Sequence, residues 1–367
     1  MKNCTDILSA KLKKEEDAVF KFRSLFEKYG YAPYKMTKFE EYDLYAKNKD
    51  FLLSNRVITF TDTNGKLMAL KPDVTLSIVK NTASDTPINK VYYNENVYRV
   101  SESTGAFKEI MQVGLECLGD VDNYTLLETL VLAEESLKVL SNDYVLSVSN
   151  LDIVSGVLDA LNLSFSDRAK VISAISSKNL GELQIVCTEN NISAEGANAL
   201  NSFITVYGEI DDVKDKLNVF VLNDALKEKV NAFIELLTNK DKVSKTQKLV
   251  VDFSVIDNMK YYNGLVFTGV VKGLPTSVLS GGQYNKLIAR MDKSFGAIGF
   301  AIYLDQIGKL SNDEAGVDVD VVLLYGDTIN PLTVIENVNS DEFKGLTVIA
   351  LKEIPTKLRY GKIVKLI

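Results

Sequence analysis

The stretch Val97–Gly119 carries the clearest alternation of polar and apolar positions in the chain. In its second half, Gln112, Gly114 and Glu116 fall on one face of a period-two pattern, and two aliphatic residues and a cysteine fall on the other. A glycine between an amide and a carboxylate leaves the backbone open to close approach. The pattern therefore predicts a strand that forms the floor of a polar pocket. An antiparallel strand with one solvent-facing side is the alternative interpretation.

The other segments before residue 150 alternate between helical and extended patterns. An Asn-Gly pair between two apolar runs predicts a hairpin over residues 56–70. Asp122 or Asn123 is the expected N-cap of a helix that carries a leucine-rich stripe. From the hydrophobic periods we predict helices over residues 12–29 and 122–140, a helix that begins near Leu76, an extended segment over 31–42, and strands over 90–94 and 144–148.

The pattern changes after residue 150. Residues 151–245 form successive short helical patterns and predict a helical insertion, with Lys240–Lys245 as a polar hinge back to the sheet. Long antiparallel strands interrupted by helices predict an α+β fold. We further predict strands over residues 249–254, 261–267 and 278–285, a glycine-entered helix over 296–307, a linker over 311–316, and a strand, helix and strand over 319–325, 332–338 and 346–351; the core then spans residues 1–312 and a small α/β module spans 317–367.

Composition narrows the class of protein. The 367 residues are 46% hydrophobic and 25% charged, as in ordinary globular proteins. The formal net charge of -7 and the pI near 5.0 argue against a nucleic-acid partner, which usually leaves a basic patch. No apolar run is long enough to span a bilayer, and the first residues lack the apolar core of a signal peptide. These features predict a cytoplasmic protein with no membrane partner.

Several kinds of chemistry are excluded or disfavoured. The chain contains no histidine, which removes the commonest general base and the commonest metal ligand. Its three cysteines are far apart and form no CxxC pair, so no metal site or disulfide framework is expected. There is no Walker-type loop and no GxGxxG motif, and we expect no cofactor. Selection against histidine codons and drift towards AT-rich codons are both open explanations for the missing histidines.

Four segments occur in a fixed order that is more specific than any one of them. They are Phe60–Thr75, Tyr98–Glu116, Tyr261–Phe267, and Ser280–Asn285 together with Ala297–Ala301. The ordered set resembles the class II aminoacyl-tRNA synthetase core, and specifically its histidyl-tRNA synthetase branch. The resemblance covers about residues 5–310. It implies an antiparallel sheet of the class II type, flanked by helices.

The resemblance directs attention to a pocket for free histidine, which carries an ammonium, a carboxylate and an imidazole ring. Asp73, Thr75 and Gln112 supply the acceptors that an ammonium needs. Arg99 can pair with the carboxylate through its planar guanidinium. We therefore predict these four residues as histidine-binding residues.

The imidazole ring needs a partner for each of its two nitrogens. Glu116 and a tyrosine hydroxyl suit that role, and the resemblance places the tyrosine at Tyr261 or Tyr262. Alternation along a strand lets only one of two adjacent side chains face the pocket, and we favour Tyr262. The amino-acid half of the site is thus complete in the sequence.

The half of the site that would bind the nucleotide is incomplete in the sequence. ATP brings several negative charges that need arginines or metal-bearing carboxylates. By resemblance, the family's histidine-specific catalytic arginine falls at Asp257 and its motif 3 arginine at Gln306, and the segment Ser101–Lys108 lacks the arginine that a motif 2 loop carries. An aspartate in place of an arginine inverts the charge where phosphates would lie. We therefore expect no catalytic residues and no adenylation.

A synthetase core of this kind resembles the regulatory subunits of ATP phosphoribosyltransferase, whose Pro-Asp-x-Thr form also occurs at Pro72–Thr75. That resemblance implies a non-catalytic partner of a short catalytic subunit in the first step of histidine biosynthesis. It implies a hetero-octamer, histidine as the bound molecule, and a homodimer of the core. A divergent histidyl-tRNA synthetase and a synthetase-like histidine-binding module that regulates another partner are the alternatives.

Overall fold

The structure is a computed structural model, and it describes residues 14–52, 56–83, 87–100, 104–244, 246, 248–256, 259, 261–309 and 317–366. The chain divides into two compact units. The larger one spans residues 13–309, and the smaller one contains residues 317–366. Each unit is described by itself. The predicted linker over residues 311–316 lies outside the described residues.

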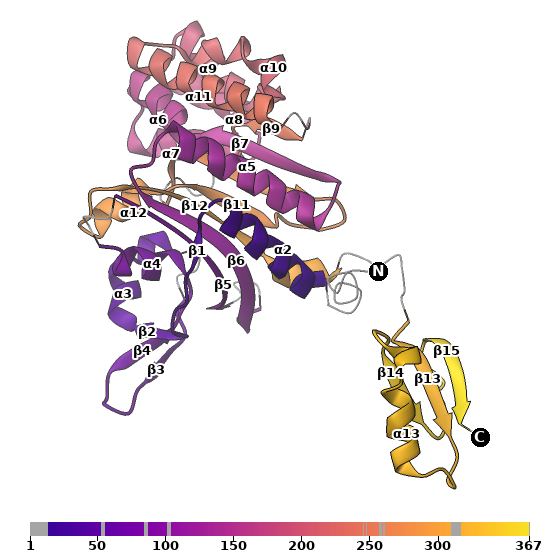
Figure 1. The fold of residues 1–367 in the computed structure, drawn as a ribbon. Coiled ribbons are helices and arrows are strands. Elements are labelled where there is room, and N and C mark those ends of the chain that lie inside the picture. The colour runs from indigo at the N-terminus through magenta and orange to yellow at the C-terminus, as the bar shows by residue number, and fades with distance from the viewer. Residues whose placement is uncertain are drawn as a thin grey trace. The chain divides into compact units, whose positions relative to one another are not determined.

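A nine-stranded mixed sheet organises the larger unit (Figure 1). The two longest strands, β5 and β6, pair in antiparallel register along their full length, with Tyr93 opposite Gly114. Among the described strands of this sheet, β1 pairs with β5 and β7 pairs with β9 in parallel, and the other neighbours are antiparallel. In spatial order the strands are β1 (Ala32–Pro33), β5 (Ile88–Val100), β6 (Phe107–Gly119), β12 (Gly296–Tyr303), β11 (Leu279–Gln283), β10 (Asn263–Val271), β7 (Tyr144–Asn150), β9 (Leu249–Asp252) and β8 (Tyr207–Gly208).

Two long helices, α2 (Lys14–Lys28) and α5 (Asn123–Leu140), pack along one face of this sheet (Figure 1). The ring of Phe26 in α2 contacts the ring of Phe300 in β12, with 6.0 Å between their centroids. Asp122 caps α5, because its carboxylate accepts a hydrogen bond of 2.8 Å from the backbone amide of Thr125. Both helices lie close to their predicted bounds, since their apolar stripes face the sheet.

The opposite face of the sheet carries a smaller substructure. The strands β2 (Phe39–Glu41), β4 (Leu67–Leu70) and β3 (Thr59–Thr61) form a separate antiparallel sheet, which confirms the hairpin predicted from Asn64-Gly65. The same substructure also contains four short helical elements: α3 (Tyr42–Lys47), η1 (Lys49–Phe51, a 3₁₀ turn), α4 (Thr75–Asn81) and α12 (Asn285–Arg290). Side chains from α3, α4, β5 and α12 share one hydrophobic cluster.

The predicted insertion is mainly helical. It comprises α6 (Leu151–Ala160), α7 (Phe165–Ser176), α8 (Leu180–Glu189), α9 (Ala194–Thr205), α10 (Ile210–Val213), η2 (Lys216–Phe220) and α11 (Asp224–Val243). The predicted polar hinge is wrong over its first four residues, because α11 continues through Val243. Lys240 is fully buried and pairs with the buried carboxylate of Glu134 in α5. A lysine that looks like linker sequence is therefore part of the packed junction between insertion and core.

Two further predictions were wrong. Gly296–Tyr303 is not a helix but strand β12, and only Leu304–Lys309 forms a short 3₁₀ helix, η3. Likewise, β5 does not stop at Asn94 but continues to Val100. Strand β12 lies between two other strands and is largely buried on both faces, so its sequence shows no period of two. A short apolar run of this kind does not distinguish a strand from a buried helix.

The smaller unit contains a three-stranded parallel sheet, with β13 (Val319–Tyr325) between β14 (Val348–Leu351) and β15 (Tyr360–Leu366). The helix α13 (Pro331–Val338) and the 3₁₀ turn η4 (Asp341–Phe343) complete it, and α13 packs on the sheet through Val334. Strand β15 was not predicted. None of the helices in the described part of the chain is long and apolar enough to cross a membrane.

Candidate functional site

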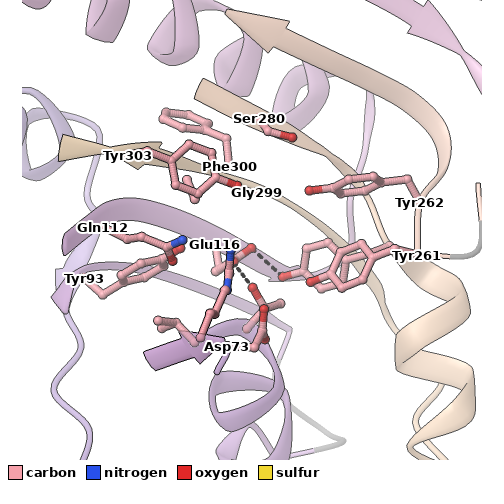
Figure 2. Close-up of a pocket in the computed structure, with 15 residues that line it drawn as sticks. Asp73, Tyr93, Gln112, Glu116, Tyr261, Tyr262, Ser280, Gly299, Phe300 and Tyr303 are labelled. Carbon is pink, nitrogen blue, oxygen red and sulfur yellow. Dashed lines mark hydrogen bonds between the residues drawn. The ribbon is translucent and has the colours of Figure 1, made fainter. Parts of the chain in front are cut away.

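A cavity opens on the face of the large sheet opposite α2 and α5, between β6, β12 and the start of α4 (Figure 2). The cavity has a volume of about 60 Å³, measured with a probe of the size of a water molecule, which leaves room for several waters or a small molecule. All seven predicted site residues line this cavity. Its lining comprises Asp73, Val74, Thr75, Tyr93, Arg99, Gln112, Glu116, Tyr261, Tyr262, Ser280, Tyr284, Gly299, Phe300, Ala301 and Tyr303.

Glu116 lies at the floor of the cavity and is 3% exposed. Its carboxylate accepts two hydrogen bonds, one of 2.6 Å from the Thr75 hydroxyl and one of 2.7 Å from the Tyr284 hydroxyl. Burial raises the pKa of Glu116 to about 8, and the negative charge of Asp73 adds to that effect, although the two hydroxyls act in the opposite direction. Glu116 is thus a buried carboxyl without a cationic partner among the lining residues.

Strand β12 makes room for this carboxyl. A Cβ atom on Gly299 would lie 1.8 Å from Oε2 of Glu116, so any other residue at this position would displace the carboxylate. Gly299 is opposite Glu116 in the β6–β12 register. The absence of a side chain at Gly299 therefore leaves the space that the Glu116 carboxylate occupies.

Asp73, Thr75 and Arg99 are held around the first turn of α4. The Asp73 carboxylate accepts a hydrogen bond of 2.8 Å from the amide of Leu76, and the Arg99 Nε donates one of 3.0 Å to the carbonyl of Pro72. Burial raises the pKa of Asp73, while the Leu76 amide and the Arg99 charge counteract it. The start of α4 and the residues just before it thus present the Asp73 carboxylate and the Thr75 hydroxyl to one side of the cavity.

Both adjacent tyrosines line the cavity, so the prediction that only Tyr262 faces it was wrong. The alternation rule does not apply, because β10 begins only at Asn263 and the register shifts just after it. The rings of Tyr261 and Tyr262 pack edge to face, with 4.6 Å between centroids, and Figure 2 shows both on the side of the cavity across from Gln112. Two tyrosines therefore form one wall.

Gln112 is 3% exposed, and its Nε2 has no hydrogen-bond partner among the described residues. Buried polar atoms without partners are rare, so this amide is a candidate contact for a bound molecule. By rotating, the amide can present either its donor or its acceptor. The charged side chains of the lining are two carboxyls and one guanidinium, an arrangement that suits a small ligand carrying both a positive and a negative group.

The sequence analysis missed several lining residues. Tyr284, Tyr303 and Ser280 lie in segments whose motif or apolar pattern was noted without a role for these side chains. Tyr93 was missed although a signal existed: it is opposite Gly114, where a Cβ atom would lie 2.4 Å from its hydroxyl. What approaches that glycine closely is the chain's own tyrosine.

Two of the side chains on which the predicted loss of the nucleotide site depends lie outside the described part of the chain. Asp257 lies outside the described residues, and so does the side chain of Gln306. Within the described residues, no group of three or more cysteine, aspartate or glutamate side chains could hold a metal ion.

Comparison with known proteins places the chain. The family model described as histidyl-tRNA synthetase matches residues 3–307. An ATP phosphoribosyltransferase regulatory subunit from Alkaliphilus metalliredigens is 27% identical over 290 residues, which is 77% of this chain and 73% of the relative.

Two solved structures are similar over most of the chain. A protein from Bacillus halodurans described as an ATP phosphoribosyltransferase regulatory subunit/histidyl-tRNA synthetase has a TM-score of 0.79 at 20% identity, covering 96% of this chain and 94% of that one. A chain in the ATP phosphoribosyl transferase (HisG:HisZ) complex from Thermotoga maritima has a TM-score of 0.62 at 20% identity, covering 78% and 96%. These likenesses establish the synthetase-like fold. The chain therefore belongs to the histidyl-tRNA synthetase family, and its curated relatives include regulatory subunits of ATP phosphoribosyltransferase.

Proposed function

We propose that this chain binds free histidine in the cavity above Glu116 and acts as the regulatory subunit of a short-form ATP phosphoribosyltransferase. The observation that supports this ligand is a buried carboxyl, Glu116, that forms no ion pair within the described residues, in the same cavity as the Gln112 amide, whose Nε2 has no hydrogen-bond partner there either. A histidine ring places an N–H donor or a positive charge against that carboxyl. Binding thereby supplies what the protein around Glu116 lacks.

The rest of the histidine molecule has matching partners. Asp73 and the Thr75 hydroxyl can accept from the ammonium, and Arg99 can pair with the carboxylate. The hydroxyls of Tyr261 and Tyr262 are available to the imidazole ring, because both side chains line the same cavity as Glu116. The cavity holds one small amino acid in this arrangement, with no charged group left unpaired.

The regulatory role rests on the relatives. Proteins named as ATP phosphoribosyltransferase regulatory subunits match about four-fifths of the chain, and a complex of that enzyme contains a chain of the same fold. In this proposal the chain is not itself an enzyme. It forms a homodimer through its core and assembles with the catalytic subunit in the cytoplasm, as a hetero-octamer.

Reconstitution tests the regulatory role. The purified chain is mixed with a short phosphoribosyltransferase subunit, and activity is measured with and without histidine. We expect the catalytic subunit to be nearly inactive alone, to become active in a stable complex, and to respond to histidine. Full activity of the catalytic subunit alone would refute the proposal. Histidine-dependent exchange of pyrophosphate into ATP by this chain would establish instead an active synthetase.

Calorimetry tests the pocket. We expect Glu116→Ala to abolish measurable histidine binding while the far-UV circular dichroism stays unchanged. Loss of a hydrogen bond to a buried charged group weakens binding by about 10- to 100-fold. The matched control is Glu109→Ala, an exposed glutamate on the same strand outside the cavity. Unchanged affinity in Glu116→Ala would show that the pocket assignment is wrong.

A further inference from the structure

A second cavity adjoins the first and shares two of its walls. Tyr262 and Ser280 line both. On the same measure, the second cavity is about 300 Å³, against about 60 Å³ for the first. Its other lining residues are Ser254, Val255, Val266, Phe267, Thr268 and Ser277, from β10 and the segments beside β9 and β11.

The chemistry of this second cavity differs from that of the first. Among the described residues, none of those that line it is charged. The hydroxyls of Ser254 and Thr268 donate to Asp252 and to the carbonyl of Leu279, so they face the cavity mainly as acceptors. An ionised group such as a phosphate would find no countercharge among these lining residues. A neutral group of moderate size fits this lining.

We refer to the Tyr262 ring as the partition, because it lines both spaces. The ring is held in place by strand β11. A Cβ atom on Gly282 would lie 3.0 Å from Cδ1 of Tyr262, so the ring rests against the backbone of β11. On its other side the ring packs against Tyr261. Figure 2 shows the Tyr262 and Ser280 side chains on the side of the cavity away from Gln112.

We propose that Tyr262 determines specificity by closing the histidine pocket towards this second cavity, and that the space behind it can take a neutral substituent on the imidazole ring. This inference rests on the proposed function. In the proposed binding mode, one nitrogen of the imidazole ring faces Glu116 and the other faces Tyr261 and Tyr262. A methyl group on the second nitrogen collides with Tyr262. Removing the Tyr262 ring joins the two cavities and gives that methyl group a place.

The test is calorimetric titration with histidine and with its two ring-methylated isomers, Nτ-methylhistidine and Nπ-methylhistidine. The wild-type chain should bind histidine at least about ten-fold more tightly than either isomer, the range that one extra methyl group produces in a fitted pocket. In Tyr262→Ala, the preference for histidine should disappear or reverse for one isomer only. Histidine itself should bind more weakly, because a hydrogen-bond partner is lost.

Three companion variants isolate the partition. Tyr262→Phe keeps the ring without the hydroxyl and should still exclude both isomers. Tyr261→Ala truncates a tyrosine that lines only the first cavity, and should weaken histidine binding without admitting either isomer. Adding Ser277→Leu to Tyr262→Ala should fill the opened space and restore exclusion.

The outcomes separate this inference from the proposed function. If the wild-type chain binds histidine but Tyr262→Ala, folded by circular dichroism, discriminates against both isomers as the wild type does, the partition is refuted and the pocket stands. Equal admission of both isomers by Tyr262→Ala also refutes it, since the opening is one-sided. If the wild-type chain binds no histidine, the proposed function fails and this inference fails with it.

Discussion

Two of the buried glutamates in the described part of the chain, Glu134 and Glu116, have opposite surroundings. Glu134 in α5 pairs with the ammonium of Lys240 in α11 and accepts hydrogen bonds from the hydroxyls of Tyr144 and Thr246. Glu116 in β6 accepts from two hydroxyls, and it has no ion pair with a described residue. The first is neutralised by the protein itself, where insertion and core meet. The second is left for something else to neutralise.

This difference separates a structural carboxylate from the carboxylate that we propose as a ligand contact. A buried ion pair with satisfied hydrogen bonds holds elements in register, and breaking it is costly. A buried carboxyl without a cation has a raised pKa and gains most from a ligand that donates a proton or brings positive charge. The same residue type at similar burial therefore has two roles, and the partners decide which.

The largest effect is expected at the insertion junction. Lys240→Met leaves the carboxylate of Glu134 buried without a cation, and should lower the free energy of unfolding by about 3–5 kcal/mol. Chemical denaturation followed by circular dichroism measures it. Adding Glu134→Gln should recover most of the loss, because the charge is then gone. Lys272→Met, which removes an exposed lysine, is the control and should leave the midpoint unchanged. A single variant as stable as the control would mean that the pair is not structural.

The next effect is a pH dependence that comes from Glu116. Because its pKa rises from an ordinary value of 4.5 to about 8 on folding, the folded chain binds more protons than the unfolded chain between these values. The free energy of unfolding should therefore fall as pH rises from 5 to 8. Glu116→Gln should flatten that slope without removing it, since Asp73 also has a raised pKa. Denaturation at four or five pH values in the absence of histidine checks this; parallel profiles for variant and wild type would contradict it.

The smallest effect concerns one of the two hydroxyls on Glu116. Tyr284→Phe removes a single hydrogen bond to the carboxylate, and should weaken histidine binding about five-fold, which corresponds to about 1 kcal/mol. Calorimetry at neutral pH measures it. Tyr45→Phe is the matched control, because the Tyr45 hydroxyl is buried outside the cavity and has no hydrogen-bond partner among the described residues. If both variants bind equally well, the Tyr284 contact does not help to shape the site.

The sequence by itself determined most of the elements and the identities of seven cavity residues. Helices α2 and α5 have one apolar stripe, and the hairpin has an Asn-Gly turn, so local patterns specify them. Asp73, Thr75, Arg99, Gln112, Glu116, Tyr261 and Tyr262 were found through ordered motifs, and they share one cavity.

Only the tertiary structure decided the rest. Strand β12 is buried between two strands, so its sequence shows no alternation. Its pairing with β6 brings Gly299 opposite Glu116. Lys240 resembles hinge sequence until α11 carries it to Glu134. The same is true of charge: the sequence contains both glutamates, but which one has a cation depends on residues more than a hundred positions away. Contacts at that separation leave no local pattern, because they depend on how the elements pack.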